Sequence, residues 1–204
     1  MLKWILAISL TCLATLSAET KVLAFAGSTR ADSVNKKLIQ EAAEIATKKG
    51  ANVTVINLGD YPLPFYDGDL ETKEGMPVNA KKLRHLMQES QVILIASPEH
   101  NSSIPALLKN ALDWASRSEK GGSSREAYKG KKFVLLSASP GKSGGQRGLV
   151  HLRSIIEDVG GEVLSEQISV PNAYTAFDTQ GHLVDPQATQ LLQNLIQKAL
   201  KGLE

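Results

Sequence analysis

The sequence predicts an α/β fold in which a parallel sheet of five strands has helices on both faces. From Lys21 onward, short apolar segments alternate with longer segments whose apolar residues recur at helical spacing. The short segments are apolar throughout rather than at every second residue, which is typical of strands that are covered on both sides. Five strands alternating with five helices therefore indicate a three-layer architecture.

The first three elements follow one another closely. Lys21–Ala26 is an apolar run that ends at Gly27, and we expect a buried strand there. Ser33–Lys49 carries apolar residues at helical spacing and ends before Gly50, which stands in the usual helix-stop position. Asn52–Asn57 is rich in β-branched residues and is predicted to be the second strand.

A long surface loop is expected next, because residues 58–76 contain two prolines and three glycines. Val78–Glu89 is predicted to be a helix, and Gln91–Ala96 a fully buried strand. Ile104–Ala115 is predicted to be the third helix.

The last third of the chain repeats the alternation. Lys132–Ala138 is predicted to be the fourth strand, after a glycine- and serine-rich loop at Gly121–Ser124. Gly148–Val159 follows as a helix, Glu162–Val170 as the last strand and Ala188–Leu200 as the last helix. We therefore expect one α/β domain without internal repeats.

Length and composition exclude several classes of protein. The chain has 204 residues, 42% of them hydrophobic and 22% charged, which excludes disorder, collagen and a multi-span membrane protein. Its net charge of +2 comes without a basic stripe, so nucleic acid is not an expected partner. The single cysteine, Cys12, excludes structural disulfides and thiolate metal sites. The four histidines lie far apart in sequence, so no metal is expected.

Residues 1–18 differ in character from the rest. Lys3 precedes an uncharged run from Trp4 to Ala18 that ends in small residues, the pattern of a secretory signal peptide. We therefore expect a signal peptide over 1–18, an exported, periplasmic protein, and one folded domain over 19–204. The alternatives are an additional N-terminal helix, a wrongly assigned start, and a cytoplasmic protein with an N-terminal extension. Cleavage after Ala18 would leave 22 basic and 21 acidic residues, a net charge of +1, and no cysteine.

Three loops that follow apolar strands are where function is expected, because ligands of such sheets lie outside the carboxyl ends of the strands. The first, residues 27–35, leads into a helix N-terminus, where free N–H groups and the helix dipole favour an anion. Ser28, Ser33 and Asn35 add neutral donors, and Arg30 adds a charge suited to phosphate. The loop matches neither G-x-G-x-x-G nor a Walker A motif. The alternative is ordinary helix capping by a carboxylate or hydroxyl of the loop.

The other two loops are weaker signals when taken singly. Residues 97–105 form a polar segment bounded by prolines, which suits a flat ligand lying along its backbone. The alternative is a solvent-exposed loop in which Glu99 and His100 are ordinary surface residues. Residues 137–147 contain three glycines, which let backbone approach a ligand closely. The prediction of a site is stronger because all three loops are expected to lie together at the ends of neighbouring strands.

Four sequence motifs occur in order along the chain. They are Gly27-Ser28-x-Arg30-x-x-Ser33-x-Asn35, Ser97-Pro98-Glu99-x-Asn101 with Ile104-Pro105-x-x-Leu108-Lys109-Asn110-Ala111-x-Asp113-Trp114, Ser137-Ala138-Ser139-Pro140-Gly141 with Gly144-Gly145-x-Arg147, and Phe177-Asp178-x-x-Gly181-x-Leu183. Together they resemble the NADPH-dependent FMN reductases of flavodoxin-like fold, a family that includes chromate and quinone reductases. The resemblance covers nearly everything from Lys21 to about Leu200.

This resemblance implies the strand order 2-1-3-4-5, a non-covalent FMN, and a homodimer or homotetramer with the flavin near a subunit interface. It assigns the first loop to the phosphate, the second to the flavin ring and the third to the pyrimidine edge of that ring. The residues so implied are Ser28, Arg30, Ser33, Val34, Asn35, Pro98, Glu99, His100, Asn101, Ser103, Ser139, Pro140 and Gly141. The chain departs from the family at His100, where an aromatic residue is usual, and in its signal-like segment, since members are typically cytosolic.

The activity implied is an NAD(P)H-dependent oxidoreductase that passes hydride through FMN to a small acceptor such as a flavin or quinone. Such an exchange needs stacking and orientation rather than a protein acid or base, so no catalytic residue is expected. Lys142 or Arg147 is a candidate for the 2′-phosphate of NADPH, with solvated surface charge as the alternative. The competing functions are a flavin-holding electron carrier and a degenerate flavin-binding module without NAD(P)H oxidation.

Overall fold

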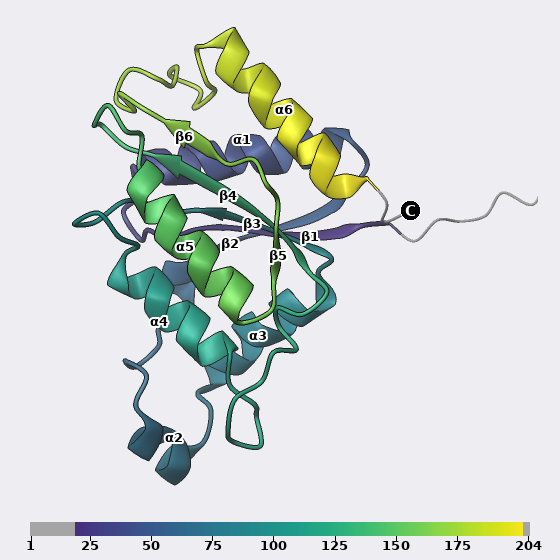
Figure 1. Cartoon of the computed structure of the whole chain (residues 1–204), viewed down its shortest axis with the longest axis vertical. Coiled ribbons are helices and arrows are strands. Elements are labelled where there is room, and N and C mark those ends of the chain that lie inside the picture. The colour runs from purple at the N-terminus through teal and green to yellow at the C-terminus, as the bar shows by residue number, and fades with distance from the viewer. Residues whose placement is uncertain (1–18, 202–204) are drawn as a thin grey trace, which may run out of the picture.

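The computed structural model describes residues 19–201 and has a central parallel sheet in the order β2-β1-β3-β4-β5 (Figure 1). Its strands are β1 (Lys21–Ala26), β2 (Asn52–Asn57), β3 (Val92–Ala96), β4 (Lys132–Ala138), β5 (Glu162–Val163) and β6 (Ile168–Val170). Every pairing that joins them is parallel. The predicted fold class and strand order are therefore confirmed. The predicted signal peptide, residues 1–18, lies outside the described residues.

The last predicted strand is divided into two, and the prediction of one continuous strand there is wrong. β5 pairs with the start of β4, and β6 pairs with its end. Between them the guanidinium of Arg153 donates to the carbonyls of Leu164 and Ser165, at 2.5 and 3.2 Å. These carbonyls bond to a side chain instead of a neighbouring strand, so the ladder is interrupted and the sheet has six strands rather than five.

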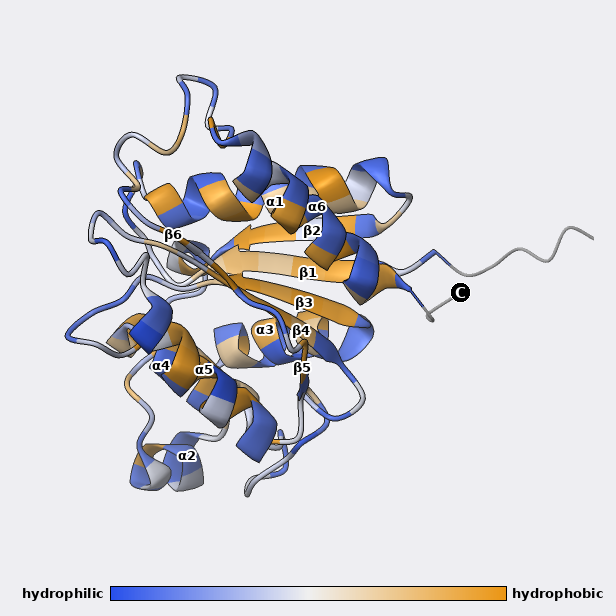
Figure 2. Cartoon of the chain, turned by 45° about the horizontal axis from the view of Figure 1, so that its top comes forward, coloured by the Kyte–Doolittle hydropathy of each residue, from blue (hydrophilic) through white to orange (hydrophobic). Residues whose placement is uncertain are grey.

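The helices form two layers, as Figure 2 shows. On one face of the sheet lie α1 (Val34–Lys48) and α6 (Pro186–Leu200), and on the other lie α3 (Val78–Glu89), α4 (Ala106–Ala115) and α5 (Gln146–Asp158). The predicted helices are thus confirmed: α3 starts at the predicted residue, and the other four start one or two residues away from the prediction. Among residues 19–201, none of the helices combines the length and apolar character needed to cross a membrane.

Alternation along the strands divides the core between the two faces. In β1, Val22 and Ala24 pack toward α1 and α6, whereas Leu23 and Phe25 pack toward α3, α4 and α5. All four are at most 1% exposed. Both faces of β1, β3 and β4 are therefore covered, which is why these strands are apolar throughout.

A short helix, α2 (Gly68–Glu74), lies inside the segment that was predicted to be a loop. It projects from the helical layer at the bottom of Figure 1. Asp67 caps its N-terminus by accepting from the N–H groups of Asp69 and Leu70, at 2.8 and 3.4 Å. A helix of seven residues depends on tertiary contacts and leaves little periodicity in the sequence. The prolines and glycines of residues 58–76 therefore led to the prediction of a loop.

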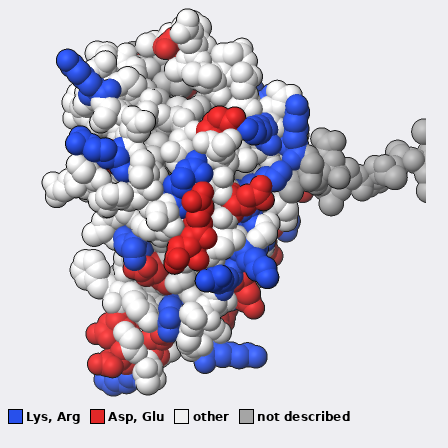
Figure 3. All heavy atoms as spheres, in the orientation of Figure 1, with Lys and Arg blue, Asp and Glu red and all other residues white. Residues whose placement is uncertain are grey.

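Charged residues are intermixed on the surface. On the face drawn in Figure 3, Lys and Arg side chains lie among Asp and Glu side chains. That face therefore carries no extended patch of a single sign, in keeping with a net charge of only +2.

Candidate functional site

The three predicted loops meet at the carboxyl edge of the sheet and enclose a hollow of about 140 Å³. We call it the carboxyl-edge hollow. The predicted residues that line it are Ser28, Arg30, Ser33, Val34, Asn35, Pro98, Glu99, His100, Ser139 and Pro140. Asn101, Ser103 and Gly141 are predicted residues that are not in its lining. The loops come from β1, β3 and β4, which are adjacent strands, and this adjacency brings the residues together.

The N-terminus of α1 opens into this hollow without a capping side chain. Ser33 is the N-cap residue, with φ −66° and ψ 125°, but its hydroxyl makes no capping hydrogen bond. Within the part of the chain that the structure describes, the N–H groups of Val34 and Asn35 have no hydrogen-bond acceptor. The alternative of ordinary capping is therefore wrong, and the free donors and helix dipole favour an anion at this end.

Arg30 lies at the rim of the hollow in a weak ion pair. Its Nη2 is 3.1 Å from Oδ1 of Asp32, and the two side chains are 68% and 80% exposed. Exposed pairs of this kind contribute about 0–1 kcal/mol, so Arg30 can exchange its partner for a bound anion at little cost. The Arg30 N–H donates to Oγ of Ser28 at 3.3 Å, which tightens the loop around the helix end.

Asn35 has a structural task in addition to its place in the lining. It is 2% exposed, its Nδ2 donates to the carbonyl of Ala138, and its Oδ1 accepts from the N–H of Ala138, each at 2.9 Å. The amide thus joins the first loop to the end of β4. Its side chain is engaged, so the backbone N–H is what Asn35 offers to a ligand.

Glu99 also holds the loops in place. Its Oε2 accepts from the N–H of Gly148 at 3.1 Å, in the first turn of α5, and its Oε1 lies 3.4 Å from Nε of Arg147. A carboxylate at a helix N-terminus is electrostatically favourable. Glu99 therefore fixes the second loop to α5. Arg147, one of the two candidates for the 2′-phosphate of NADPH, is already paired with Glu99. The other, Lys142, is exposed.

The turn after Glu99 directs Asn101 and Ser103 elsewhere. His100 and Ser103 exchange backbone hydrogen bonds of 2.9 and 3.0 Å, and Asn101 and Ser102 between them have φ of 50° and 64°. Positive φ at both central positions is the geometry of a tight type I′ turn. Oγ of Ser103 lies 3.0 Å from Nδ1 of His151 on α5, outside the hollow.

Two glycines allow the third loop to pack closely. At Gly145, with φ +90°, a Cβ would lie 1.9 Å from Oγ of Ser137, and at Gly144, with φ +60°, it would lie 2.8–2.9 Å from backbone atoms of residues 169–171. No side chain fits at either position, so these glycines are required by close approach as well as by conformation.

Sequence reasoning missed Tyr174, which lines the carboxyl-edge hollow from the loop after β6. Its ring is on the surface, with the residue 74% exposed. A tyrosine soon after a strand of the sheet, at the carboxyl edge, was the available signal. It was overlooked because residue 174 falls between the predicted last strand, which ends at Val170, and the last motif, which begins at Phe177.

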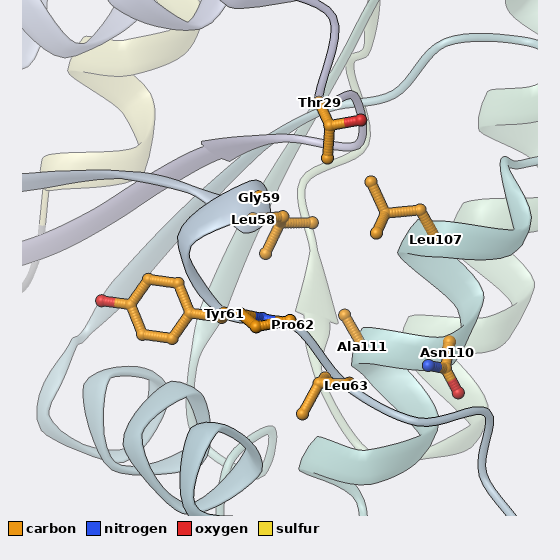
Figure 4. Close-up of a pocket in the computed structure, with 9 residues that line it drawn as sticks. All are labelled: Thr29, Leu58, Gly59, Tyr61, Pro62, Leu63, Leu107, Asn110 and Ala111. Carbon is orange, nitrogen blue, oxygen red and sulfur yellow. The ribbon is translucent and has the colours of Figure 1, made fainter.

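A second cavity, of about 260 Å³, lies on the other side of the first loop. It is bounded by the loop after β2 and by α4, and Figure 4 shows Leu58 and Leu107 directed toward the same space, with Thr29 above them. Its lining is mainly apolar, in contrast to the hydroxyl and charged groups of the carboxyl-edge hollow. No group of three or more potential metal-ligating side chains gathers anywhere in residues 19–201.

Comparison with known proteins identifies the family of the chain. The sequence model of the NADPH-dependent FMN reductase family matches residues 20–175, a range that contains all three loops. The chain is 32% identical over 183 residues to an NAD(P)H-dependent FMN reductase of Pseudomonas aeruginosa, covering 89% of this chain and 94% of that protein. It is 31% identical over 141 residues to a quinone reductase of Escherichia coli K12, covering 69% and 71% of the two chains.

Solved structures show the same architecture. The flavoenzyme NAD(P)H:(acceptor) oxidoreductase FerB of Paracoccus denitrificans superposes with a TM-score of 0.76 at 26% identity, covering 90% of this chain and 97% of that one. An archaeal flavodoxin superposes with a TM-score of 0.61 at 12% identity, which shows the shared fold alone. With its flavodoxin-like sheet, its loop set and the match over residues 20–175, the chain belongs to the NADPH-dependent FMN reductase family.

Proposed function

We propose that this protein is an NAD(P)H-dependent oxidoreductase that holds FMN in the carboxyl-edge hollow and reduces a small acceptor such as a quinone or a free flavin. The observation that carries the proposal is the uncapped N-terminus of α1, which opens beside Arg30 into a hollow also lined by the second and third loops. Family membership and curated relatives named FMN reductase and quinone reductase support the same activity.

The residues present fit the phosphate of FMN. That group is an anion with several acceptor oxygens, and this end of the hollow offers the free N–H groups of Val34 and Asn35, the hydroxyls of Ser28 and Ser33, and the guanidinium of Arg30. The fit follows from charge and donor count, since these groups donate or carry positive charge.

The other end of the hollow suits a flat ring. Pro98 and His100 come from the second loop, and Ser139 and Pro140 come from the third. The chemistry that bound FMN supplies is two-electron transfer between a reduced nicotinamide and an oxidised acceptor. The protein residues bind and orient, and we assign none of them a proton-transfer role. Glu99 and Asn35 position the loops through their contacts with α5 and β4.

The test is a titration of the apo-protein with FMN, followed by rapid mixing of the yellow complex with NADPH and with NADH. We expect saturable binding and bleaching of the flavin absorbance, then reoxidation by added quinone. A complex that binds FMN but is not bleached supports the electron carrier instead. A protein that takes up no FMN contradicts the proposal.

A homodimer or homotetramer is a second part of the proposal. It is supported by the family resemblance and by α4, where Leu107 is a large apolar side chain 36% exposed. Sedimentation at micromolar concentration is expected to give a dimer or larger species, and a monomer alone would contradict it.

We also propose export, on the sequence pattern of residues 1–18. The described domain begins with β1 at Lys21, two residues beyond a cleavage point after Ala18. Cell fractionation with mass spectrometry of the N-terminus tests this: a mature species that begins at Glu19 in the exported fraction is expected. An intact Met1 peptide in the soluble cytoplasmic fraction would favour the cytoplasmic alternative.

A further inference from the structure

Tyr174 is an exposed aromatic residue at the wall of a hollow whose other lining residues are polar or small and apolar, apart from His100. It is 74% exposed, and its phenolic oxygen has no hydrogen-bond partner in the described part of the chain. Burial therefore does not account for the ring. Among the other lining residues, the ring of His100 is the one further aromatic group.

The loop that carries Tyr174 is held in place although its tip is exposed. The N–H of Ala173 donates to the carbonyl of Ser139 at 3.1 Å, and the N–H of Asn172 donates to the carbonyl of Gly141 at 3.4 Å. The carbonyl of Asn172 accepts from the N–H of Thr175 at 3.0 Å, which closes a turn around Tyr174. This loop is thus tied to the third loop of the hollow.

Glycine at position 144 makes that connection possible. A Cβ there would lie 2.8 and 2.9 Å from backbone atoms of Val170 and Pro171, so the two loops meet only because the side chain is absent. Tyr174 is therefore carried on a backbone that is fixed relative to Ser139 and Pro140. Such preorganisation lowers the entropic cost of a contact with a ligand.

The strand order places Tyr174 across the hollow from His100. β3 and β6 both pair with β4, on its two sides, and neighbouring strands lie about 4.8 Å apart, so the loops that follow β3 and β6 leave the sheet about 10 Å apart. The β4 loop, with Ser139 and Pro140, lies between them. A flat ligand seated on the β4 loop is therefore flanked by His100 on one side and Tyr174 on the other.

We propose that the ring of Tyr174 contacts FMN bound in the carboxyl-edge hollow and closes its β6 side against water. The proposal rests on the proposed function, because it takes FMN to be the occupant. It assigns the ring, and not the hydroxyl, as the contacting group, because the exposed ring offers the larger surface to a flat ligand.

The experiment measures the dissociation constant for FMN of the wild type and of the Tyr174→Ala and Tyr174→Phe variants. Leu191→Ala serves as the control, since it removes a large apolar side chain that is 62% exposed on α6 and does not line the hollow. We expect at least a tenfold weaker affinity in Tyr174→Ala and less than a threefold change in Tyr174→Phe and Leu191→Ala. The rise in melting temperature that FMN causes should be smallest in Tyr174→Ala and close to that of the wild type in Tyr174→Phe and Leu191→Ala.

Melting temperatures without FMN and the pattern of affinities separate this proposal from its alternatives. Melting temperatures without FMN are expected to be equal in all four proteins, which shows that the fold is intact. Wild-type affinity in Tyr174→Ala overturns the role of Tyr174 and leaves the proposed function standing, whereas a wild type that binds no FMN overturns both. Equal losses in Tyr174→Phe and Tyr174→Ala overturn the assignment to the ring. Unchanged affinity with dissociation of an oligomer would make Tyr174 a contact to a second copy instead.

Discussion

Within residues 19–201, the base of α2 and the lining of the carboxyl-edge hollow each contain an arginine–carboxylate pair and a tyrosine. In the α2 cluster, Nε of Arg117 lies 3.0 Å from both oxygens of Glu71, and Nη2 lies 2.8 Å from Oε2. The hydroxyl of Tyr66 donates to the same Oε2 at 3.1 Å, and the guanidinium lies 5.2 Å from the centre of the Tyr66 ring. Glu71 is only 7% exposed.

The hollow uses the same residue types with the opposite arrangement. Arg30 makes a single 3.1 Å contact with Asp32, both side chains are mainly exposed, and Tyr174 contacts neither of them by a hydrogen bond within the described residues. A mainly buried carboxylate that accepts from both an arginine and a tyrosine holds its partners firmly, whereas an exposed, weakly paired group can exchange them at little cost. The difference indicates that the α2 cluster stabilises the fold, and it favours the hollow as the place where Arg30 meets a ligand.

The largest expected effect is on stability at the α2 cluster. Arg117→Ala leaves the carboxylate of Glu71 buried without its cation and should lower the free energy of unfolding by about 3 kcal/mol. Arg30→Ala, the matched control, should change it by less than about 0.5 kcal/mol because its pair is exposed. Urea unfolding of both variants measures this, and equal losses would remove the distinction between the two regions.

The next effect is on binding at the hollow. Arg30→Ala should weaken FMN affinity by about 1.5–3 kcal/mol, the scale of a hydrogen bond to a charged group. Lys120→Ala, which removes an exposed cation remote from the hollow, should leave the affinity unchanged. Calorimetric titration gives the two values, and an unaltered affinity in Arg30→Ala would return Arg30 to the ordinary surface.

Acid should weaken the α2 cluster. Hydrogen bonds from Arg117 hold the pKa of Glu71 below its ordinary value of 4.5. Because the folded protein binds this proton more weakly than the unfolded chain does, the stabilisation is complete above pH 4.5 and is lost as the pH falls through the lowered pKa. Unfolding free energies measured from pH 6 to pH 3 should therefore fall less steeply in Glu71→Gln than in the wild type. Parallel slopes would contradict the assignment.

The smallest effect concerns Glu41, a buried carboxylate that makes no ion pair with a lysine or arginine in the described part of the chain. Glu41 on α1 is 7% exposed and accepts from the N–H of Leu183 at 2.9 Å, and burial raises its pKa. Stability is then lost as the pH rises through this raised pKa, because the unfolded chain ionises more readily. Glu41→Gln keeps an acceptor without the charge, so at pH 7 it should change the free energy of unfolding by less than about 1 kcal/mol. A loss as large as that of Glu71→Gln would contradict this.

Much of the site could be predicted because it depends on local patterns at strand ends. Residues 27–35 lead from an apolar strand into a helix, and residues 97–105 and 137–147 follow two further apolar strands. Carboxyl ends of adjacent parallel strands share one edge, so identifying the strands was enough to bring the loops together. The uses of Asn35 and Glu99 could not be predicted, because their partners are Ala138 and Gly148, 103 and 49 residues away.

By itself, the sequence determined the alternation of strands and helices, the parallel sheet and the family, since each depends on apolar periodicity or on short motifs. Tertiary structure alone decided where Arg153 interrupts the last strand, how Arg117 anchors α2, and that Tyr174 joins the wall of the hollow. Periodicity reports which face of an element is buried, but it carries no information on which distant side chain a given polar group will meet. Those pairings form only when packing brings segments together, and they distinguish Arg117, which is tied into the fold, from Arg30, which stays exposed at the rim of the hollow.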